Sequence, residues 1–384
     1  MRADAGRNPL AISLERVWLY GAACATVASL PFILLPWFHD VAYRYDFACF
    51  WSAGANAGTT TLTDPQRLRE WAATHHMIAQ PFSYPPAFAW FYAPLSRLPP
   101  MRGLAVEELL MTAIFAIAAL LAARTYGFGK LFSIAAVLAW APTVSSIEVG
   151  QNTALAVALI FVAGWALTRN RSGVAGLAVG LLLYKPTVAL PLVLLLLARK
   201  EWRAIGITAL CAAGWYVASV AASGGDLFWP RSYLQTVTWW LPLDFAGGPS
   251  KAFTIPTMLM ALGVHWQTAW AIGVVILALA LPIAARVSAI EAASVMPLVG
   301  LTASIHAWPY DAATALPAVF FAMTRLREPW RTPVIAAIYL GVALGMVVQH
   351  GVFALAAVCG GGTALWVWSR FPMAVSVVPE RPIC

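Results

Sequence analysis

The sequence predicts an all-α integral membrane protein, and the composition together with the lengths of the apolar segments carries this prediction. Hydrophobic residues make up 61% of the 384 residues and charged residues only 10%, whereas charged residues form about 25% of an ordinary soluble domain. A water-soluble monomer of this size could not bury so much apolar surface. Apolar runs of about 20 residues are long enough to cross the hydrocarbon core of a bilayer as helices.

The first apolar run covers residues 17–36 and follows three arginines near the N-terminus. A helix of about 20 residues spans a hydrocarbon core of roughly 30 Å. Trp37, Phe38 and two polar residues follow the run, where a signal peptide would have small residues at its cleavage site. We therefore expect a retained first transmembrane helix.

Further apolar runs continue along the chain, separated by short polar turns. They cover approximately residues 104–123, 131–147, 151–168, 173–198, 205–222, 266–285, 290–305, 311–324, 333–349 and 352–369. The run at 173–198 carries Lys185 and Pro186 in its middle. Proline breaks the helical hydrogen-bond ladder and a lysine is costly in lipid, so we predict two half-helices that meet at a polar elbow. Such irregular backbone at membrane depth predicts a cavity beside it.

The distribution of Lys and Arg predicts the orientation. If the N-terminus is cytoplasmic and the segments alternate, two thirds of the 24 Lys and Arg residues fall on the cytoplasmic side, mostly in short turns, which is the positive-inside pattern. Both termini are then cytoplasmic, with about 10–12 transmembrane helices, some of them broken or re-entrant. The long loops lie on the outer face, the first at 37–103 and the second from about residue 223 to residue 251.

We expect a single polytopic membrane domain over residues 1–384. The first outer loop, 37–103, contains a semi-apolar stretch from Tyr84 to Leu98 that three prolines interrupt, so we predict an interfacial or re-entrant segment there. The remaining transmembrane bundle occupies 104–370, and 371–384 form a cytoplasmic tail.

Several kinds of chemistry are not expected. The basic residues are scattered between apolar runs, so the net charge of +8 does not predict nucleic-acid binding. None of the 5 cysteines forms a CxxC pair, and we interpret them as small buried hydrophobes. The chain has no HExxH, Walker, GxSxG or DxD motif, so we expect no cofactor and no metal.

The most distinctive acid is Asp46, which lies shortly beyond the first expected helix between Tyr45 and Phe47. Apolar walls raise the basicity of a carboxylate, and aromatic rings stack on sugars. Asp46 is therefore a candidate general base and Tyr45 a candidate for substrate binding. The small residues at 52–58 would allow close approach of backbone or substrate. The alternative is a surface acid paired with Arg44.

Two more motifs lie within or beside apolar runs. Gln151 and Asn152 stand at the outer start of a helix, where they are substrate-binding candidates. The alternative is that Asn152 or Thr153 is a plain N-cap. A lysine inside an apolar run indicates a functional role by default. Lys185 could hold an anionic head group such as a phosphate. Snorkelling to the interface is the alternative for this lysine.

The segment 304–311 gathers an imidazole, a phenol and a carboxylate on the outer face, from His306, Tyr310 and Asp311. The alternative is a turn in which Asp311 caps the next helix. Because Pro309 lies between His306 and Asp311, these two residues are not on consecutive turns of one helix, and we predict no metal site.

Taken together and in order, these motifs resemble the polytopic glycosyltransferase family 87, a bacterial group of the GT-C superfamily. Its members include polyprenyl-phosphate-mannose-dependent α-mannosyltransferases. The resemblance covers residues 40–325 and rests on Asp46, Phe82-Ser83-Tyr84-Pro85-Pro86-Ala87-Phe88, Ala93-Pro94-Leu95-Ser96-Arg97-Leu98-Pro99, Gly150-Gln151-Asn152, Lys185-Pro186 and His306-Ala307-Trp308-Pro309-Tyr310-Asp311.

The resemblance implies a GT-C fold and a metal-independent, inverting transfer. A polyprenyl-phosphate sugar, with mannose expected, would enter from the membrane, and a hydroxyl of a glycolipid or polysaccharide acceptor would enter from the periplasmic side. Asp46 would be the general base, and Lys185, with His306 as second candidate, would hold the donor phosphate. The substrate-binding candidates are Tyr45, Tyr84, Gln151, Asn152, Tyr310 and Asp311.

Two other functions compete with this one. A polytopic transporter or lipid-linked sugar flippase would also carry broken helices, and a scaffold of a cell-envelope assembly would need no catalytic acid. Against a transporter, the sequence has no internal repeat and its polar residues gather on one face. We therefore predict a multi-pass enzyme of the cell membrane whose active site lies on the periplasmic side.

Overall fold

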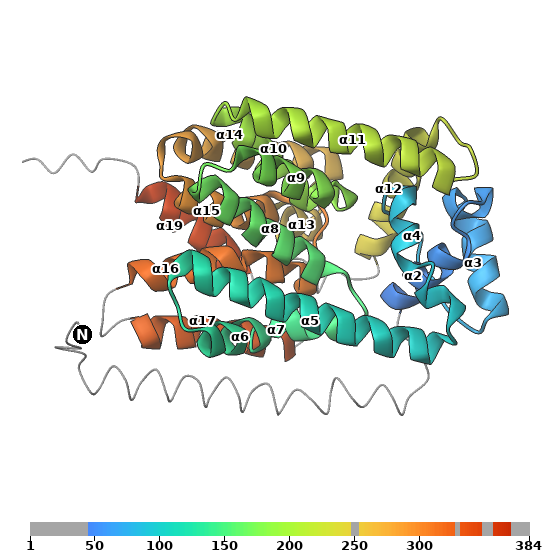
Figure 1. Ribbon diagram of the computed structural model, residues 1–384, viewed down its shortest axis with the longest axis horizontal. Helices are drawn as coiled ribbons and strands as arrows, with labels where there is room; N and C mark the ends of the chain where they lie inside the picture. Colours follow the sequence, from blue (N-terminus) through green and yellow to red (C-terminus); the bar gives the residue numbers. More distant parts are fainter. Residues whose placement is uncertain (1–44, 247–252, 327–330, 348–355, 370–384) are drawn as a thin grey trace, which may run out of the picture.

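The computed structural model describes residues 45–246, 253–326, 331–347 and 356–369, and the regular structure within these ranges is helical (Figure 1). The α-helices are α2 (Tyr45–Ala55), α3 (Pro65–Thr74), α4 (Ala89–Tyr92), α5 (Pro100–Tyr126), α6 (Lys130–Leu138), α7 (Ala141–Glu148), α8 (Thr153–Thr168), α9 (Ser172–Leu181), α10 (Pro186–Ala198), α11 (Trp202–Ala222), α12 (Trp229–Ala246), α13 (Ile255–Ala261), α14 (Trp266–Arg286), α15 (Ala289–Ala303), α16 (Leu316–Arg325), α17 (Arg331–Val347) and α19 (Gly362–Trp368). Short 3₁₀ helices include η3 (Thr60–Thr63), η4 (Pro86–Phe88), η5 (Leu95–Arg97), η6 (Leu182–Tyr184) and η8 (Pro309–Ala315).

Several of these helices have the length and the composition of membrane spans. Among the described residues, α5, α11 and α14 are long and apolar enough to cross a bilayer, and α6 with α7 forms a fourth candidate that bends by 63°. Large apolar side chains stay exposed on the long helices, such as Leu210 at 72% and Leu279 at 66%. Contiguous apolar surface of this kind fits lipid and not water. The predicted all-α membrane architecture is confirmed.

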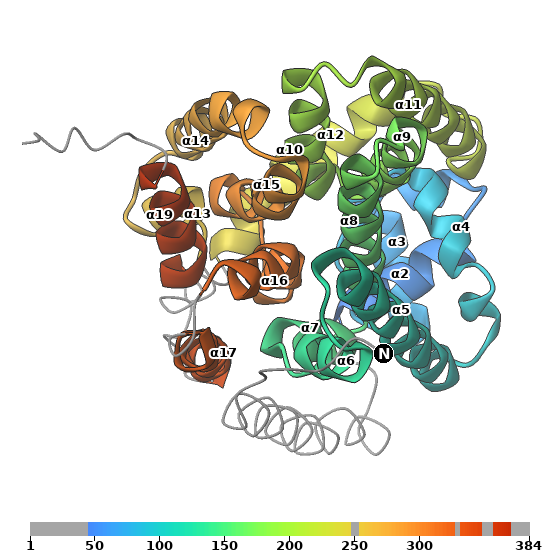
Figure 2. The ribbon, with the colours of Figure 1, turned by 60° about the vertical axis from the view of Figure 1, so that its left-hand side comes forward.

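The helices pack in two groups (Figures 1 and 2). In one group α8 and α9 lie between α5 and α11, and in the other α15 packs against α10, α14 and α16. Small residues allow the close approach of neighbouring helices, as is common between membrane helices. A Cβ atom at Gly176 of α9 would come within 2.3 Å of the carbonyl oxygen of Ala204 of α11.

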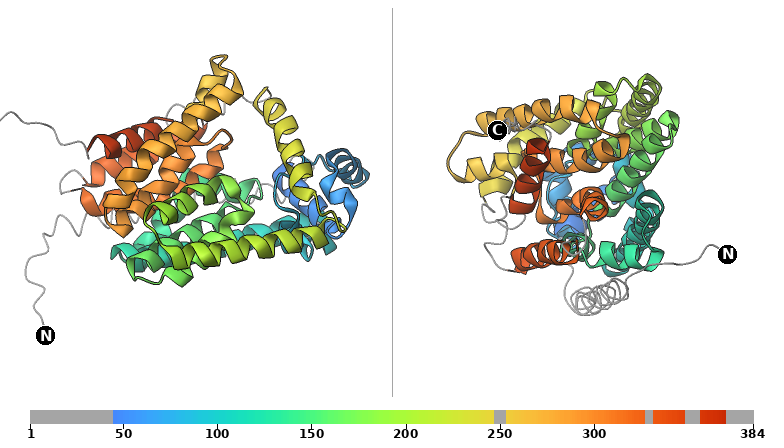
Figure 3. Two further views of the ribbon diagram at one scale, coloured as in Figure 1. Left: turned by 90° about the horizontal axis from the view of Figure 1, so that it is seen from above. Right: turned by 90° about the vertical axis from the view of Figure 1, so that its left-hand side faces the viewer.

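A smaller group of helices, α2, α3, α4 and α12, gathers at one end of the molecule (Figures 1 and 3). Within it, the Ser96 hydroxyl donates to the carbonyl oxygen of Trp51 at 2.7 Å. A Cβ atom at Gly54 would lie 2.6 Å from the carbonyl carbon of Tyr92. The small residues that follow Asp46 therefore serve close packing of α2 against α4 and η5.

The predicted elbow in the run at 173–198 is confirmed. The chain ends α9 at Leu181, tightens into η6, and leaves helical geometry at Lys185, where φ is −122° and ψ is 78°. Helix α10 begins at Pro186, because proline is well tolerated in the first turn, where no intrahelical donor is needed. Lys185 therefore stands at the junction of two half-helices.

Other predicted segments differ from the structure. The run at 131–147 is not one straight span, because it breaks at Trp140 before Pro142 in the first turn of α7. The outer loop at 223–251 contains the 18-residue helix α12, and the loop at 37–103 contains α2, α3 and α4. The expected first transmembrane helix at 17–36 and the tail at 371–384 lie outside the described residues.

Candidate active site

A central cavity lies beside the elbow, and residues far apart in the sequence line it. Its volume is about 720 Å³, including the space at its open mouth. The lining residues are Ser83 and Tyr84 before η4, Lys185, Pro186 and Thr187 at the start of α10, Tyr233, Val237 and Trp240 of α12, and Ile305, His306, Tyr310 and Asp311 after α15. The structure thus brings together five of the predicted site residues, namely Tyr84, Lys185, His306, Tyr310 and Asp311.

An ion pair stands in the wall of this cavity. Nζ of Lys185 lies 2.5 Å from Oδ1 of Asp311, and both side chains are only 8% exposed. Oδ2 of Asp311 accepts the backbone N–H of Trp308 at 3.0 Å, so the same carboxylate caps the turn that opens η8 and pairs with the lysine. Asp311 therefore offsets the charge of Lys185 within the protein.

A hydrogen-bond chain behind the lining connects two of its phenols. The Tyr84 hydroxyl lies 3.4 Å from Oε1 of Gln151, and Nε2 of Gln151 donates to the Tyr310 hydroxyl at 3.0 Å. Burial raises the pKa of Tyr84 well above its usual value, and the carboxylates of Asp311 and Asp46 raise it further. The phenol therefore stays protonated and remains a hydrogen-bond donor. Gln151 supports the lining residues from behind.

Asn152 is buried next to this chain. It occupies the N-cap position of α8, but its side chain makes no capping hydrogen bond, so the alternative of a plain Asn152 cap is wrong. Its backbone oxygen accepts the Tyr184 hydroxyl at 3.0 Å, which ties α8 to the elbow. The side-chain amide lies beside the Tyr84 phenol.

Asp46 lies in the first turn of α2 and is partly exposed. It is not one of the described residues that line the central cavity. Its carboxylate nevertheless contributes to the raised pKa of Tyr84, after burial and Asp311, so Asp46 lies within electrostatic range of a residue that lines the cavity. The side chain of Tyr45, at the start of α2, lies outside the described part of the chain.

The sequence interpretation missed a buried acid, Glu107 of α5. Its Oε1 accepts the Tyr92 hydroxyl at 3.1 Å. Gly150 fits against it, because a Cβ atom there would lie 2.9 Å from Oε2 of Glu107 and 2.6 Å from Cβ of Phe47. The Gly-Gln-Asn motif is thereby packed against α2 and α5. The signal that could have identified Glu107 is an acid inside an apolar run.

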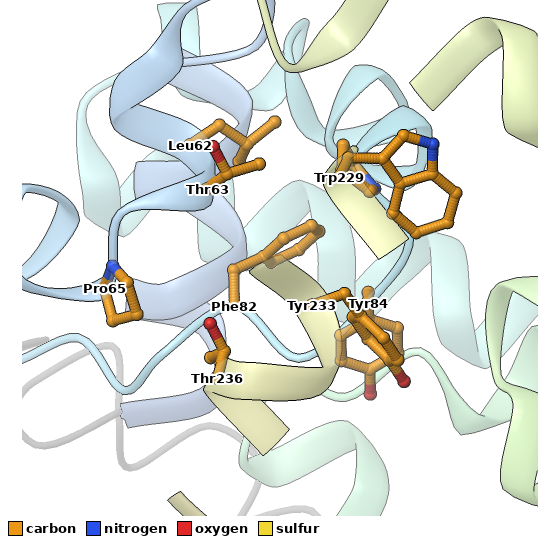
Figure 4. A pocket seen from close by; sticks show the side chains of 9 residues that line it. Leu62, Thr63, Pro65, Phe82, Tyr84, Trp229, Tyr233 and Thr236 are labelled. Carbon is orange, nitrogen blue, oxygen red and sulfur yellow. The ribbon is translucent and has the colours of Figure 1, made fainter. Parts of the chain in front are cut away.

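Two smaller cavities adjoin the central one. An apolar crevice of about 280 Å³ between α10 and α15 shares Thr187, His306 and Asp311 with it, and its other lining residues are Val188, Pro191, Pro297, Gly300, Leu301, Ser304, Ala307 and Thr314. An outer cavity of about 310 Å³ shares Tyr84 and Tyr233 with it (Figure 4), and its other lining residues are Leu62, Thr63, Pro65, Phe82, Pro86, Trp229 and Thr236. The central cavity therefore borders an apolar space and an aromatic one.

Metal binding has no support in the described ranges, where no group of three or more His, Cys, Asp and Glu side chains could hold an ion. Metal-independent chemistry stays a prediction, since parts of the chain lie outside those ranges.

Comparison with known proteins agrees with the sequence resemblance. The model of the family described as Glycosyltransferase family 87 matches residues 82–309, which is more than half of the chain. The matched range includes Tyr84, Gln151, Lys185 and His306, whereas Asp46 precedes it. No curated protein and no solved structure gives a significant match.

Proposed function

The chain belongs to glycosyltransferase family 87, and on this premise we propose that it transfers mannose from a polyprenyl-phosphate donor to a glycolipid or polysaccharide hydroxyl. That the chain is a membrane glycosyltransferase follows from the family and from its apolar helices. One observation carries the finer proposal: Lys185, His306 and the start of α10 share one cavity that continues into an apolar crevice.

The donor phosphate would lie against Lys185 and the first turn of α10. A helix N-terminus attracts anions, and Pro186 and Thr187 of this turn line the central cavity. An ammonium has three donors, of which Asp311 takes one and Thr153, at 3.4 Å, can take another. A third donor remains for a phosphate oxygen. His306 could donate to the same phosphate in either protonation state.

The lipid part of the donor would occupy the apolar crevice. Most of the crevice lining is apolar, with Val188, Pro191 and Leu301 among its residues, and it meets the central cavity at His306. A phosphate held by Lys185 would therefore place its ester-linked chain beside a partly apolar surface. This arrangement favours a lipid-linked donor over a water-soluble one.

The proposed reaction is a single in-line displacement. The acceptor oxygen forms a bond to the anomeric carbon, the bond from that carbon to the phosphate oxygen breaks, and its electron pair stays on the phosphate. Asp46 takes the proton of the acceptor hydroxyl as general base. The leaving phosphate is an anion from the start, so Lys185 and His306 stabilise its developing charge. One displacement inverts the anomeric configuration.

The test uses purified protein in lipid nanodiscs with octyl α-mannoside as acceptor and no divalent metal. We expect transfer from polyprenyl-phosphate mannose and none from GDP-mannose. Transfer from the nucleotide sugar alone, or strict dependence on a metal ion, would overturn the proposal.

The site is proposed to face the periplasm, with both termini cytoplasmic. A single cysteine introduced as Thr63→Cys should then react with a membrane-impermeant maleimide in cells whose outer membrane admits the reagent. Labelling only after the inner membrane is broken would contradict this orientation.

A further inference from the structure

One face of α12 borders both the central and the outer cavity. Trp229, Tyr233 and Thr236 line the outer cavity, and Tyr233, Val237 and Trp240 line the central one. Spacings of three and four residues place these side chains on one side of a helix. Tyr233 belongs to both linings, so α12 forms a common wall for two adjoining binding spaces.

The outer cavity has the lining expected for a neutral sugar ring. Aromatic rings, prolines and the hydroxyls of Thr63 and Thr236 surround it, and no charged side chain is among the described residues that line it. Figure 4 shows the Phe82 ring amid Thr63, Trp229 and Thr236. Such a lining suits a neutral ring and offers no cation to a phosphate.

The position of the outer cavity fits the second substrate of a transfer reaction. Tyr84 and Tyr233 line both this cavity and the central one, and their hydroxyls lie toward the same end in Figure 4. The carboxylate of Asp46 also contributes to the raised pKa of Tyr84. A ligand in the outer cavity would therefore lie against Tyr84, which also lines the cavity proposed for the donor.

We infer that the outer cavity binds the terminal sugar ring of the acceptor, and that Tyr233 and Thr236 of α12 determine which acceptor is used. This inference rests on the proposed transfer reaction and deepens it, because it assigns the second substrate. The elements involved, η3, α3 and α12, are not among the described helices that qualify as membrane spans. A polar sugar would reach them from the aqueous side.

Tyr233 and Thr236 both keep hydrogen-bonding capacity for sugar hydroxyls. Oγ1 of Thr236 donates to the carbonyl oxygen of Ser232 at 3.0 Å, which leaves its lone pairs for a sugar hydroxyl. Burial raises the pKa of Tyr233 to about 12, so its phenol remains a donor. Arg69 of α3 lies 5.6 Å from the ring centre of Trp239, and this cation–π contact helps to hold α12 over the cavity.

The kinetic test compares Tyr233→Phe and Thr236→Val with Thr238→Val, which alters an exposed position of α12. With octyl α-mannoside as acceptor, each of the first two variants should raise the acceptor KM roughly tenfold, as expected for one lost hydrogen bond. For Thr236→Val, which alters a residue of the outer cavity lining alone, the donor KM should stay unchanged, and Thr238→Val should behave as the wild type. A shift in donor KM without a shift in acceptor KM would overturn the assignment.

A labelling experiment tests the same cavity without turnover. Thr63→Cys, in a chain whose native cysteines are replaced by serine, should react with maleimide more slowly in octyl α-mannoside. Neither n-octanol nor polyprenyl-phosphate mannose should slow it. Protection without transfer from the lipid donor would refute the proposed function and support the cavity assignment. Transfer without protection would refute the cavity assignment alone.

Discussion

The substitution Asp311→Asn should lower the free energy of unfolding by about 3 kcal/mol. Removing one partner of a buried ion pair costs about 3–5 kcal/mol, because the other charge stays buried without compensation. Lys185 and Asp311 are each 8% exposed and the central cavity lies beside them, so water can reach the lysine and the lower value applies. Asparagine keeps an oxygen for the N–H of Trp308, so the variant removes the charge and retains the cap.

A double-mutant cycle isolates the pair from other effects of the substitution. Lys185→Met leaves the carboxylate uncompensated and should cost a similar amount. The double variant removes both charges, so its loss should be smaller than the sum of the single losses by about 2 kcal/mol or more. Equilibrium unfolding in mixed detergent micelles with increasing SDS, followed by circular dichroism, gives the free energies.

The control is Thr153→Val, which removes only the 3.4 Å contact of Lys185 with that hydroxyl and should cost less than about 1 kcal/mol. If the losses of the two charge variants add in the double variant to within about 0.5 kcal/mol, the two side chains are not coupled. The interpretation of Lys185 and Asp311 as a buried ion pair that stabilises the fold would then be wrong.

Three further predictions concern the site and its support. Asp46→Asn should keep the protein folded and lower turnover about 10²–10⁴-fold in a radiolabelled-sugar assay; near-normal turnover at normal expression would remove the base assignment. Lys185→Ala should mainly raise the donor KM and His306→Ala should mainly lower kcat, and the reverse pattern would exchange their roles. Gly150→Ala should unfold more easily than Gly58→Ala: both glycines have a positive φ, but only a Cβ at Gly150 would clash, at 2.6 Å, adding about 1–3 kcal/mol. Equal losses would contradict this.

The features predicted from the sequence are those that one local signal specifies. Apolar runs identify the described helices of the two large groups because lipid-facing and core-facing residues are both apolar. The elbow follows from Lys185 and Pro186, since a proline removes a backbone donor and a lysine resists lipid. The chemistry of the segment 304–311 was visible because its imidazole, phenol and carboxylate are neighbours in the chain.

The features that the sequence did not predict depend on contacts between distant segments. Lys185 and Asp311 are 126 residues apart, and no spacing rule relates them. Helix α12 mixes tryptophans with Thr, Gln and Arg, so it has no continuous apolar run, and its role becomes visible only when the cavity it faces is known. The sequence did not predict the bend before Pro142, because the apolar run continues across it.

The ion pair also bears on how the proposed donor would be held and released. Asp311 cannot move away from Lys185 without losing its hydrogen bond to the backbone N–H of Trp308. The lysine therefore keeps its partner when the donor binds. A phosphate would then meet a cation that is already offset, and His306 and the N-terminus of α10 would supply much of its stabilisation. Moderate attraction of this kind favours turnover, because the lipid phosphate left after transfer must leave the cavity before a new donor enters. A stronger, unpaired cation would also bind the product phosphate more tightly, which would slow its release and would not raise kcat.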